Sequence, residues 1–174
     1  MTLFNTDHED NGRPAEDYLN RPPENLVLNG YRGWLLHAAE RDPCHLNEVW
    51  KLYCAKVGER NAGFVMSGLE GLIRQLGICA TCPLRFARPK TNYLCRDECL
   101  VLGLIAGLQN SDEEAAYESA SALTCAAKSN EVMVSGGEFA MALKYAGQQL
   151  LPINAETIRW IVHERASPAK NTVH

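Results

Sequence analysis

Four cysteines in the middle of the chain have the spacing of ligands that hold one metal ion. Cys79 and Cys82 form one close pair, and Cys95 and Cys99 form a second pair after twelve intervening residues. Two close pairs joined by a short loop allow four thiolates to converge on a tetrahedral centre. The second pair falls in a segment of helical periodicity, and residues i and i+4 of a helix share one face. We therefore predict that both of its sulfurs point at one metal ion.

A structural zinc ion is the first interpretation of this site, because zinc takes four thiolates at about 2.3 Å in a closed tetrahedron. A turn with Cys79 and Cys82, followed by a helix with two further ligands, resembles the zinc-finger pattern. The C-x2-C-x12-C-x3-C spacing also has the length of that pattern, with cysteines at its usual histidine positions. Phe86 falls where the first core aromatic of a finger lies, whereas Asn92 replaces the expected leucine. The resemblance covers residues 79–99 and implies a metal geometry rather than the reading of DNA.

Two other interpretations of the four cysteines remain open at this point. Four thiolates also hold iron–sulfur clusters, whose motifs vary widely, so spacing alone does not separate iron from zinc. The closed arrangement of two pairs favours zinc. Cysteine is also a common small core residue, although packing alone does not explain the turn pair Cys79 and Cys82. For the cysteines that occur singly we predict core packing; these are Cys44, Cys54 and Cys125.

The loop between the two cysteine pairs is basic, and it is the predicted contact with a partner. We expect a protein or another acidic macromolecule to bind there, and nucleic acid is not excluded. So few charges would give a weak, salt-sensitive contact. The alternative is that these cations point at the sulfurs and balance the charge of about −2 on a tetrathiolate zinc. The predicted contact residues are Arg85, Phe86, Arg88, Lys90 and Arg96.

Catalytic motifs are not evident elsewhere in the sequence. There is no phosphate loop, dinucleotide fingerprint, nucleophile elbow or HExxH helix. Asp97 and Glu98 lie beside Cys99 and could act as acid and base next to a metal, but acidic residues at a helix start more commonly stabilise its first turn. We therefore predict a binding or regulatory module with a structural zinc. The alternative is an iron–sulfur redox sensor, electron carrier or metallocofactor accessory protein.

The elements that must position these residues read as helices from residue 26 to residue 166. Apolar residues recur at helical spacing in seven segments, and no segment alternates as a strand would. We predict a single compact all-α domain of six or seven helices, with the four-cysteine site embedded at residues 79–99. Ser111 and Glu114 have the spacing of a capping box. The expected N-caps are Thr91 or Asn92, Ser111 and Asn154.

The charge of the chain is concentrated near its start. The net charge is −4, and residues 1–25, with six acidic and two basic residues, account for all of it. The polar composition and the three prolines of this segment predict a flexible acidic arm. We also expect a flexible tail at residues 167–174. The overall charge argues against a general nucleic-acid binder.

No segment indicates export or insertion into a membrane. The first residues lack the basic and apolar regions of a signal peptide. The longest apolar run, residues 99–108, is too short to span a bilayer. Seven cysteines in such a chain are typical of a reducing compartment. We therefore expect a cytoplasmic protein in which close cysteine pairs are ligands rather than disulfides.

Overall fold

A computed structural model describes residues 19–80, 83–87, 91 and 93–164 of the chain. These residues form a compact domain of seven α-helices without a strand, which confirms the predicted all-α class. No helix in the described part is both long and apolar enough to cross a membrane. The helices are α2 (Pro22–Glu40), α3 (Cys44–Val57), α4 (Glu59–Cys79), α5 (Arg96–Asn110), α6 (Glu113–Leu123), α7 (Ser129–Tyr145) and α8 (Ala155–Glu164).

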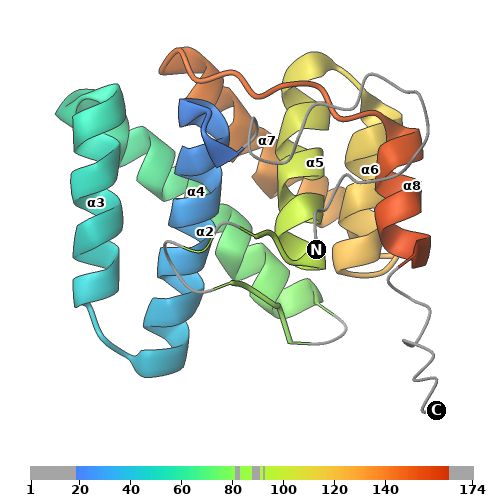
Figure 1. Cartoon of the computed structure of the whole chain (residues 1–174), viewed down its shortest axis with the longest axis horizontal. Coiled ribbons are helices and arrows are strands. Elements are labelled where there is room, and N and C mark those ends of the chain that lie inside the picture. The colour runs from blue at the N-terminus through green and yellow to red at the C-terminus, as the bar shows by residue number, and fades with distance from the viewer. Residues whose placement is uncertain (1–18, 81–82, 88–90, 92, 165–174) are drawn as a thin grey trace, which may run out of the picture.

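Helix α5 forms the centre of the domain. It packs against α2, α6, α7 and α8, and Figure 1 shows α3 and α4 on one side of it and α6 and α8 on the other. Its residues from Leu100 to Gly107 are all buried. A helix that is apolar on all sides requires neighbours on all sides, which explains why α5 lies in the middle of the bundle.

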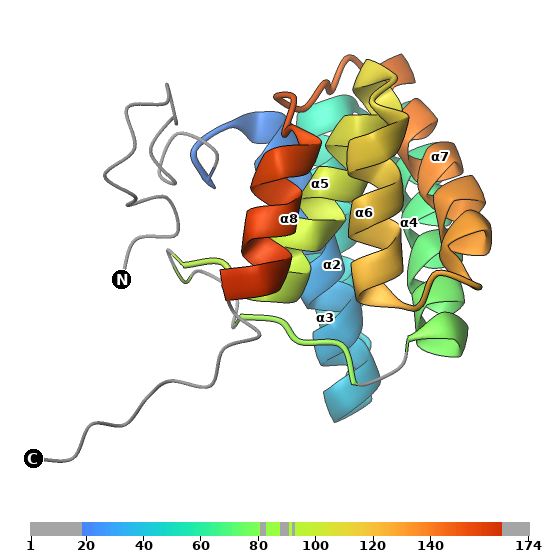
Figure 2. The same ribbon diagram turned by 90° about the vertical axis from the view of Figure 1, so that its right-hand side faces the viewer.

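Helices α4 and α7 lie side by side at one edge of the domain (Figure 2). They run antiparallel, because Gly68 lies beside Phe139 while Arg60, eight residues earlier, shares a hollow with Tyr145. A Cβ atom at Gly68 would lie 2.8 Å from the Cα of Phe139. The absence of a side chain at this position therefore allows the two backbones to approach closely.

The folded domain begins earlier than the sequence predicts. Helix α2 begins at Pro22, a residue type that the first turn of a helix accepts. Glu24, assigned above to the acidic arm, is buried, and it accepts a hydrogen bond from the backbone N–H of Leu151 at 2.7 Å. This partner is 127 residues away, so local composition gives no indication of it. Residues 1–18 and 165–174 lie outside the described part, and with them most of the predicted arm and the predicted tail.

Of the predicted helix starts, one is confirmed and two are wrong. Asn154 caps α8, because its Oδ1 accepts from the N–H of Thr157 at 2.8 Å. The N-cap of α6 is Asp112, whose side chain accepts from the N–H of Ala115 at 3.0 Å. Ser111 instead ends α5 in the left-handed conformation, with a φ of 60°. Helix α5 begins at Arg96 with Cys95 as its N-cap, later than the predicted caps at residues 91 and 92.

Candidate functional site

The α4–α5 loop, residues 80–95, has no regular secondary structure where it is described, and a buried ion pair lies against it. Arg32 of α2 donates from Nε to Oε1 of Glu98 at 2.7 Å and from Nη2 to Oε2 at 3.1 Å. The exposed fraction is 3% for Arg32 and 0% for Glu98. A two-point pairing of this kind is the strong, directional form of the arginine–carboxylate contact.

The same ion pair binds the backbone on both sides of residues 88–90. The Glu98 carboxylate accepts from the N–H groups of Ala87 and Cys95, each at 2.9 Å. Arg32 donates from Nη2 to the carbonyl of Tyr93 at 2.9 Å and from Nη1 to the carbonyl of Thr91 at 3.3 Å. A buried ion pair is tolerated when further hydrogen bonds satisfy its remaining donors and acceptors. Here the loop backbone supplies those hydrogen bonds.

A second group of contacts holds the loop at the backbone of Arg85. Its N–H donates to Oδ2 of Asp97 at 2.8 Å. Its carbonyl accepts from the Tyr31 hydroxyl at 3.1 Å and from the Cys95 thiol at 3.3 Å. Burial, and then the negative charge of Asp97, raises the pKa of Tyr31, so the phenol stays protonated and remains a donor. Asp97 and Glu98 thus bind backbone groups and stabilise the start of α5, as acidic residues at a helix start commonly do.

The structure describes three of the four cysteines of the predicted metal site, Cys79, Cys95 and Cys99. Cys79 ends α4, is buried, and accepts a hydrogen bond from Nε2 of Gln75 at 3.0 Å. Cys99 is buried in the core. Within the described ranges, no three Cys, His, Asp or Glu side chains form a group that could hold a metal ion. Cys82 lies outside those ranges, so a four-cysteine centre is not found in the described part of the fold, and metal binding stays a prediction.

Cys95 and Cys99 do not lie on one face of a helix as predicted, because only Cys99 is inside α5. Cys95 precedes the first helical residue, and its ψ of 169° is extended. The Glu98 side chain accepts from its N–H in a capping box, which fixes this backbone conformation. Burial, and then the charge of Glu98, raises the pKa of the Cys95 thiol to about 11. The thiol is therefore protonated at neutral pH, and a metal ion that bound it would have to displace a proton.

Cys79 and Cys95 also differ in the charged groups around them. The pKa of Lys128 is raised, first by its hydrogen bond with Glu131 and further by Cys79 and Cys125. Cys79 therefore lies within electrostatic range of the start of α7, whereas Cys95 affects Tyr31 on α2. No disulfide joins two of the described cysteines.

The residues predicted to contact a partner have different roles in the structure. The Arg85 side chain is exposed while its backbone is held in place. Arg96 is half-buried and pairs with Asp97 at 3.4 Å. Arg88 and Lys90 lie outside the described residues. Phe86 is half-buried at a hollow of about 590 Å³, whose other lining residues are Leu35, Ala38, Ala39, Gly77, Ala80, Pro83 and Leu84.

The most important residue that sequence reasoning missed is Arg32. One signal was available: Leu28, Leu35 and Leu36 lie four residues before and three and four residues after this arginine, so it shares a helix face with apolar side chains. A charged residue in such a position requires a buried partner. Its partner, Glu98, is 66 residues later in the chain, and nothing local in the sequence connects the two.

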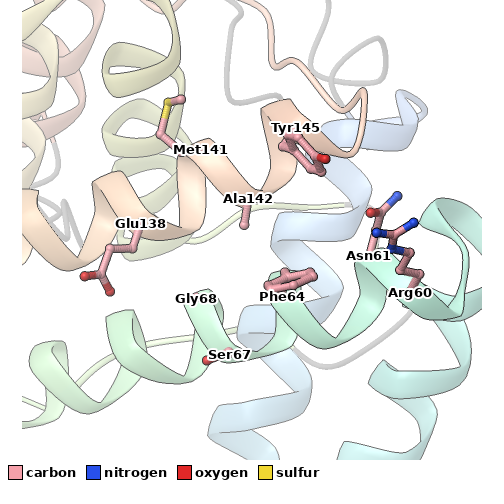
Figure 3. A pocket seen from close by; sticks show the side chains of 9 residues that line it. All are labelled: Arg60, Asn61, Phe64, Ser67, Gly68, Glu138, Met141, Ala142 and Tyr145. Atoms are coloured by element: carbon pink, nitrogen blue, oxygen red, sulfur yellow. The ribbon is translucent and has the colours of Figure 1, made fainter.

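A second hollow, of about 840 Å³, lies between α4 and α7 and was also missed (Figure 3). Three large side chains around it are exposed: Phe64 by 66%, Met141 by 59% and Tyr145 by 83%. Ile78 and Val134, on the same two helices, are exposed as well. The full lining is Arg60, Asn61, Phe64, Ser67, Gly68, Glu138, Met141, Ala142 and Tyr145.

Comparison of the chain with protein-family models, with curated proteins and with solved structures gave no match. The functional argument therefore depends on the residues of this chain and on their geometry.

Proposed function

We propose that this chain is a binding or regulatory protein that presents the α4–α5 loop to an acidic protein partner. The observation that carries the proposal is the buried pair of Arg32 and Glu98, which holds an irregular loop by its backbone on both sides of residues 88–90. A loop fixed in this way loses little conformational entropy when a partner binds, and that lowers the cost of binding.

The chemistry of the loop supports an acidic partner with an apolar anchor. Residues 80–96 contain four Arg and Lys residues and no Asp or Glu. Arg85 is exposed, and the hollow beside Phe86 is lined by apolar side chains and glycine. Tyr93 adds an aromatic side chain that is 56% exposed. An acidic peptide with one leucine or phenylalanine would match both features.

A defined peptide tests this proposal directly. We expect a fluorescent Glu- and Asp-rich peptide with a central leucine to bind the full chain, more weakly as salt rises, and the same peptide with Lys in place of the acidic residues not to bind. Arg85→Glu, and separately the double change Arg88→Glu and Lys90→Glu, should weaken binding. Lys56→Glu, a charge reversal on α3, is the matched control. Equal affinity for both peptides, or equal loss with the control, contradicts the proposal, and preference for a single-stranded oligonucleotide indicates nucleic acid instead.

Metal binding is the second candidate function, and the spacing of Cys79, Cys82, Cys95 and Cys99 is the observation that favours it. A zinc ion held by these thiolates would link the end of α4 to the start of α5 and act structurally. An iron–sulfur cluster would make the protein a redox sensor, electron carrier or cofactor accessory protein. In either case Cys95 would have to give up its hydrogen bond to the Arg85 carbonyl.

Metal analysis of protein purified without oxygen separates these outcomes. One equivalent of zinc in a colourless protein supports the structural site, and visible absorbance with bound iron supports a cluster. Cys79→Ser should then lose the metal, while Cys54→Ser, a change in a cysteine outside the motif, should retain it. If the native protein carries no metal, both metal hypotheses are wrong, and the ion pair and the contacts at Arg85 hold the loop without a metal.

A further inference from the structure

The α4–α7 face combines exposed apolar side chains with small residues. On α4, Phe64, Ser67 and Gly68 are spaced so that they share one side of the helix, and on α7 Met141 and Tyr145 do the same. Five of the eight large apolar side chains that the described part exposes belong to these two helices. Exposed large apolar side chains gathered around one hollow, as Phe64, Met141 and Tyr145 are here, are typical of a contact with another protein.

The charges of this face are of opposite sign and lie at opposite ends of the hollow. Arg60 lies at the end marked by Asn61 and Tyr145, and Glu138 lies at the other end, near Gly71 (Figure 3). Both charged residues are exposed, and neither forms an ion pair with another described residue. Other exposed charges nearby are paired, for example Arg74 with Glu70 at 2.6 Å.

The placement of the two opposite charges at opposite ends of the hollow makes this face complementary to itself. A two-fold axis that lies in the contact plane and crosses both helices at the centre of the hollow, near Ala142, places each helix over its own copy with the direction reversed. The ends of the hollow then exchange, so Arg60 of each copy meets Glu138 of its mate. A face that is complementary to itself in this way is what an isologous dimer requires.

We propose that the α4–α7 face binds a second copy of this chain, with Arg60 of each copy paired to Glu138 of the other. An axis shifted toward Gly71 would also cover Ile78 and Val134, but it would bring the two Glu138 carboxylates together, which is unfavourable. The self-complementary patch is small, so we expect an affinity on the order of micromolar. This inference does not involve the α4–α5 loop, and the peptide experiments leave it untouched.

Reversing each charge in a separate variant tests whether the partner is a second copy of the chain. Arg60→Glu places two acidic residues in each contact, and Glu138→Arg places two basic residues there. We expect each variant alone to dimerise at least about tenfold more weakly than the wild type in analytical ultracentrifugation. An equal mixture of the two variants should dimerise again, because each contact then pairs one acidic with one basic residue.

Two controls keep this test interpretable. Lys56→Glu and Glu156→Lys reverse exposed charges on α3 and α8 and should leave dimerisation unchanged. Thermal unfolding of every variant should match that of the wild type, because the structure gives Arg60 and Glu138 no partner to lose within the described part of the same copy. A wild-type protein that stays monomeric at high concentration overturns the proposal. A dimer insensitive to either reversal, or a mixture that stays monomeric, does so too.

Discussion

The α4–α5 loop and the α4–α7 face lie on the same domain and differ in how their charged groups are paired. The loop has an irregular backbone, yet the buried charges that hold it, Arg32 of α2 and Glu98 of α5, are paired with each other and hydrogen-bonded to the loop. The face consists of two regular helices, yet Arg60 and Glu138 have no ion-pair partner among the described residues and its large apolar side chains are exposed. Regular secondary structure therefore does not show whether the charged groups of a surface are paired and its apolar side chains buried within one copy of the chain. The pairing of each charge and the burial of each apolar side chain must be checked residue by residue.

The largest expected effect comes from breaking the buried ion pair that holds the loop. Arg32→Met should lower the free energy of unfolding by about 3–5 kcal/mol, because it leaves the Glu98 carboxylate buried without its counter-charge. Urea denaturation measures the change. Adding Glu98→Leu should recover only part of it, since the N–H groups of Ala87 and Cys95 then lose their acceptor. A single variant as stable as the wild type would show that the pair does not hold the loop.

A smaller effect is expected where α4 meets α7. Gly68→Ala should destabilise by about 1–3 kcal/mol, because its Cβ would lie 2.8 Å from the Cα of Phe139 and push the helices apart. Gly63→Ala on the same helix meets nothing within 4 Å. It should instead stabilise by up to about 1 kcal/mol through helix propensity. Thermal unfolding of both variants checks the sign of each change, and two changes of the same sign would contradict the described packing.

A single hydrogen bond to the loop should contribute less still. Tyr31→Phe removes the hydroxyl that donates to the Arg85 carbonyl at 3.1 Å. We expect a loss of about 1 kcal/mol, the usual contribution of one such bond. Tyr93→Phe, in an exposed side chain of the same loop, is the control and should be close to neutral in the same denaturation experiment. Equal losses in both variants would mean that the Tyr31 bond has no special role.

The smallest change in stability is expected on the α4–α7 face. Tyr145→Ser should alter the unfolding free energy of the monomer by no more than about 0.5 kcal/mol, because this side chain is 83% exposed. The same change should weaken self-association, since the ring would be buried in the dimer. Denaturation at low protein concentration and ultracentrifugation at high concentration separate the two effects. A large loss of monomer stability would show that Tyr145 belongs to the core of its own copy.

Local sequence patterns predicted the helices well, because the apolar stripe of a helix is visible within a few turns. They failed where distant residues decide the backbone. The start of α5 depends on Glu98, which binds Arg32 of α2, and the true N-cap is a cysteine, which is not a preferred capping residue. Glu24 appeared to be part of an acidic arm because its partner, the N–H of Leu151, is far away in the chain.

The candidate sites were only partly predictable for the same reason. Sequence reasoning located the loop and named Arg85, which is exposed, and Phe86, which lines a hollow. It did not find Arg32. Metal binding by the four cysteines stays a prediction, because Cys82 lies outside the described residues. The α4–α7 face escaped notice because Phe64, Met141 and Tyr145 fall outside the apolar stripes of their helices, and single apolar side chains on a surface are ordinary. Only the position of neighbouring helices shows which of these side chains are exposed.

The contacts that Arg32 and Glu98 make with the loop also bear on how the protein tolerates sequence change. They bind the N–H groups of Ala87 and Cys95 and the carbonyls of Thr91 and Tyr93. Every residue supplies a carbonyl, and every residue except proline supplies an N–H. The contacts of Arg32 and Glu98 therefore do not depend on most of the side chains in the loop. Lengthening a loop costs little closure entropy, so residues 88–90 are a natural place for inserting or grafting a new sequence. The fold could in this way carry different recognition segments on one unchanged frame.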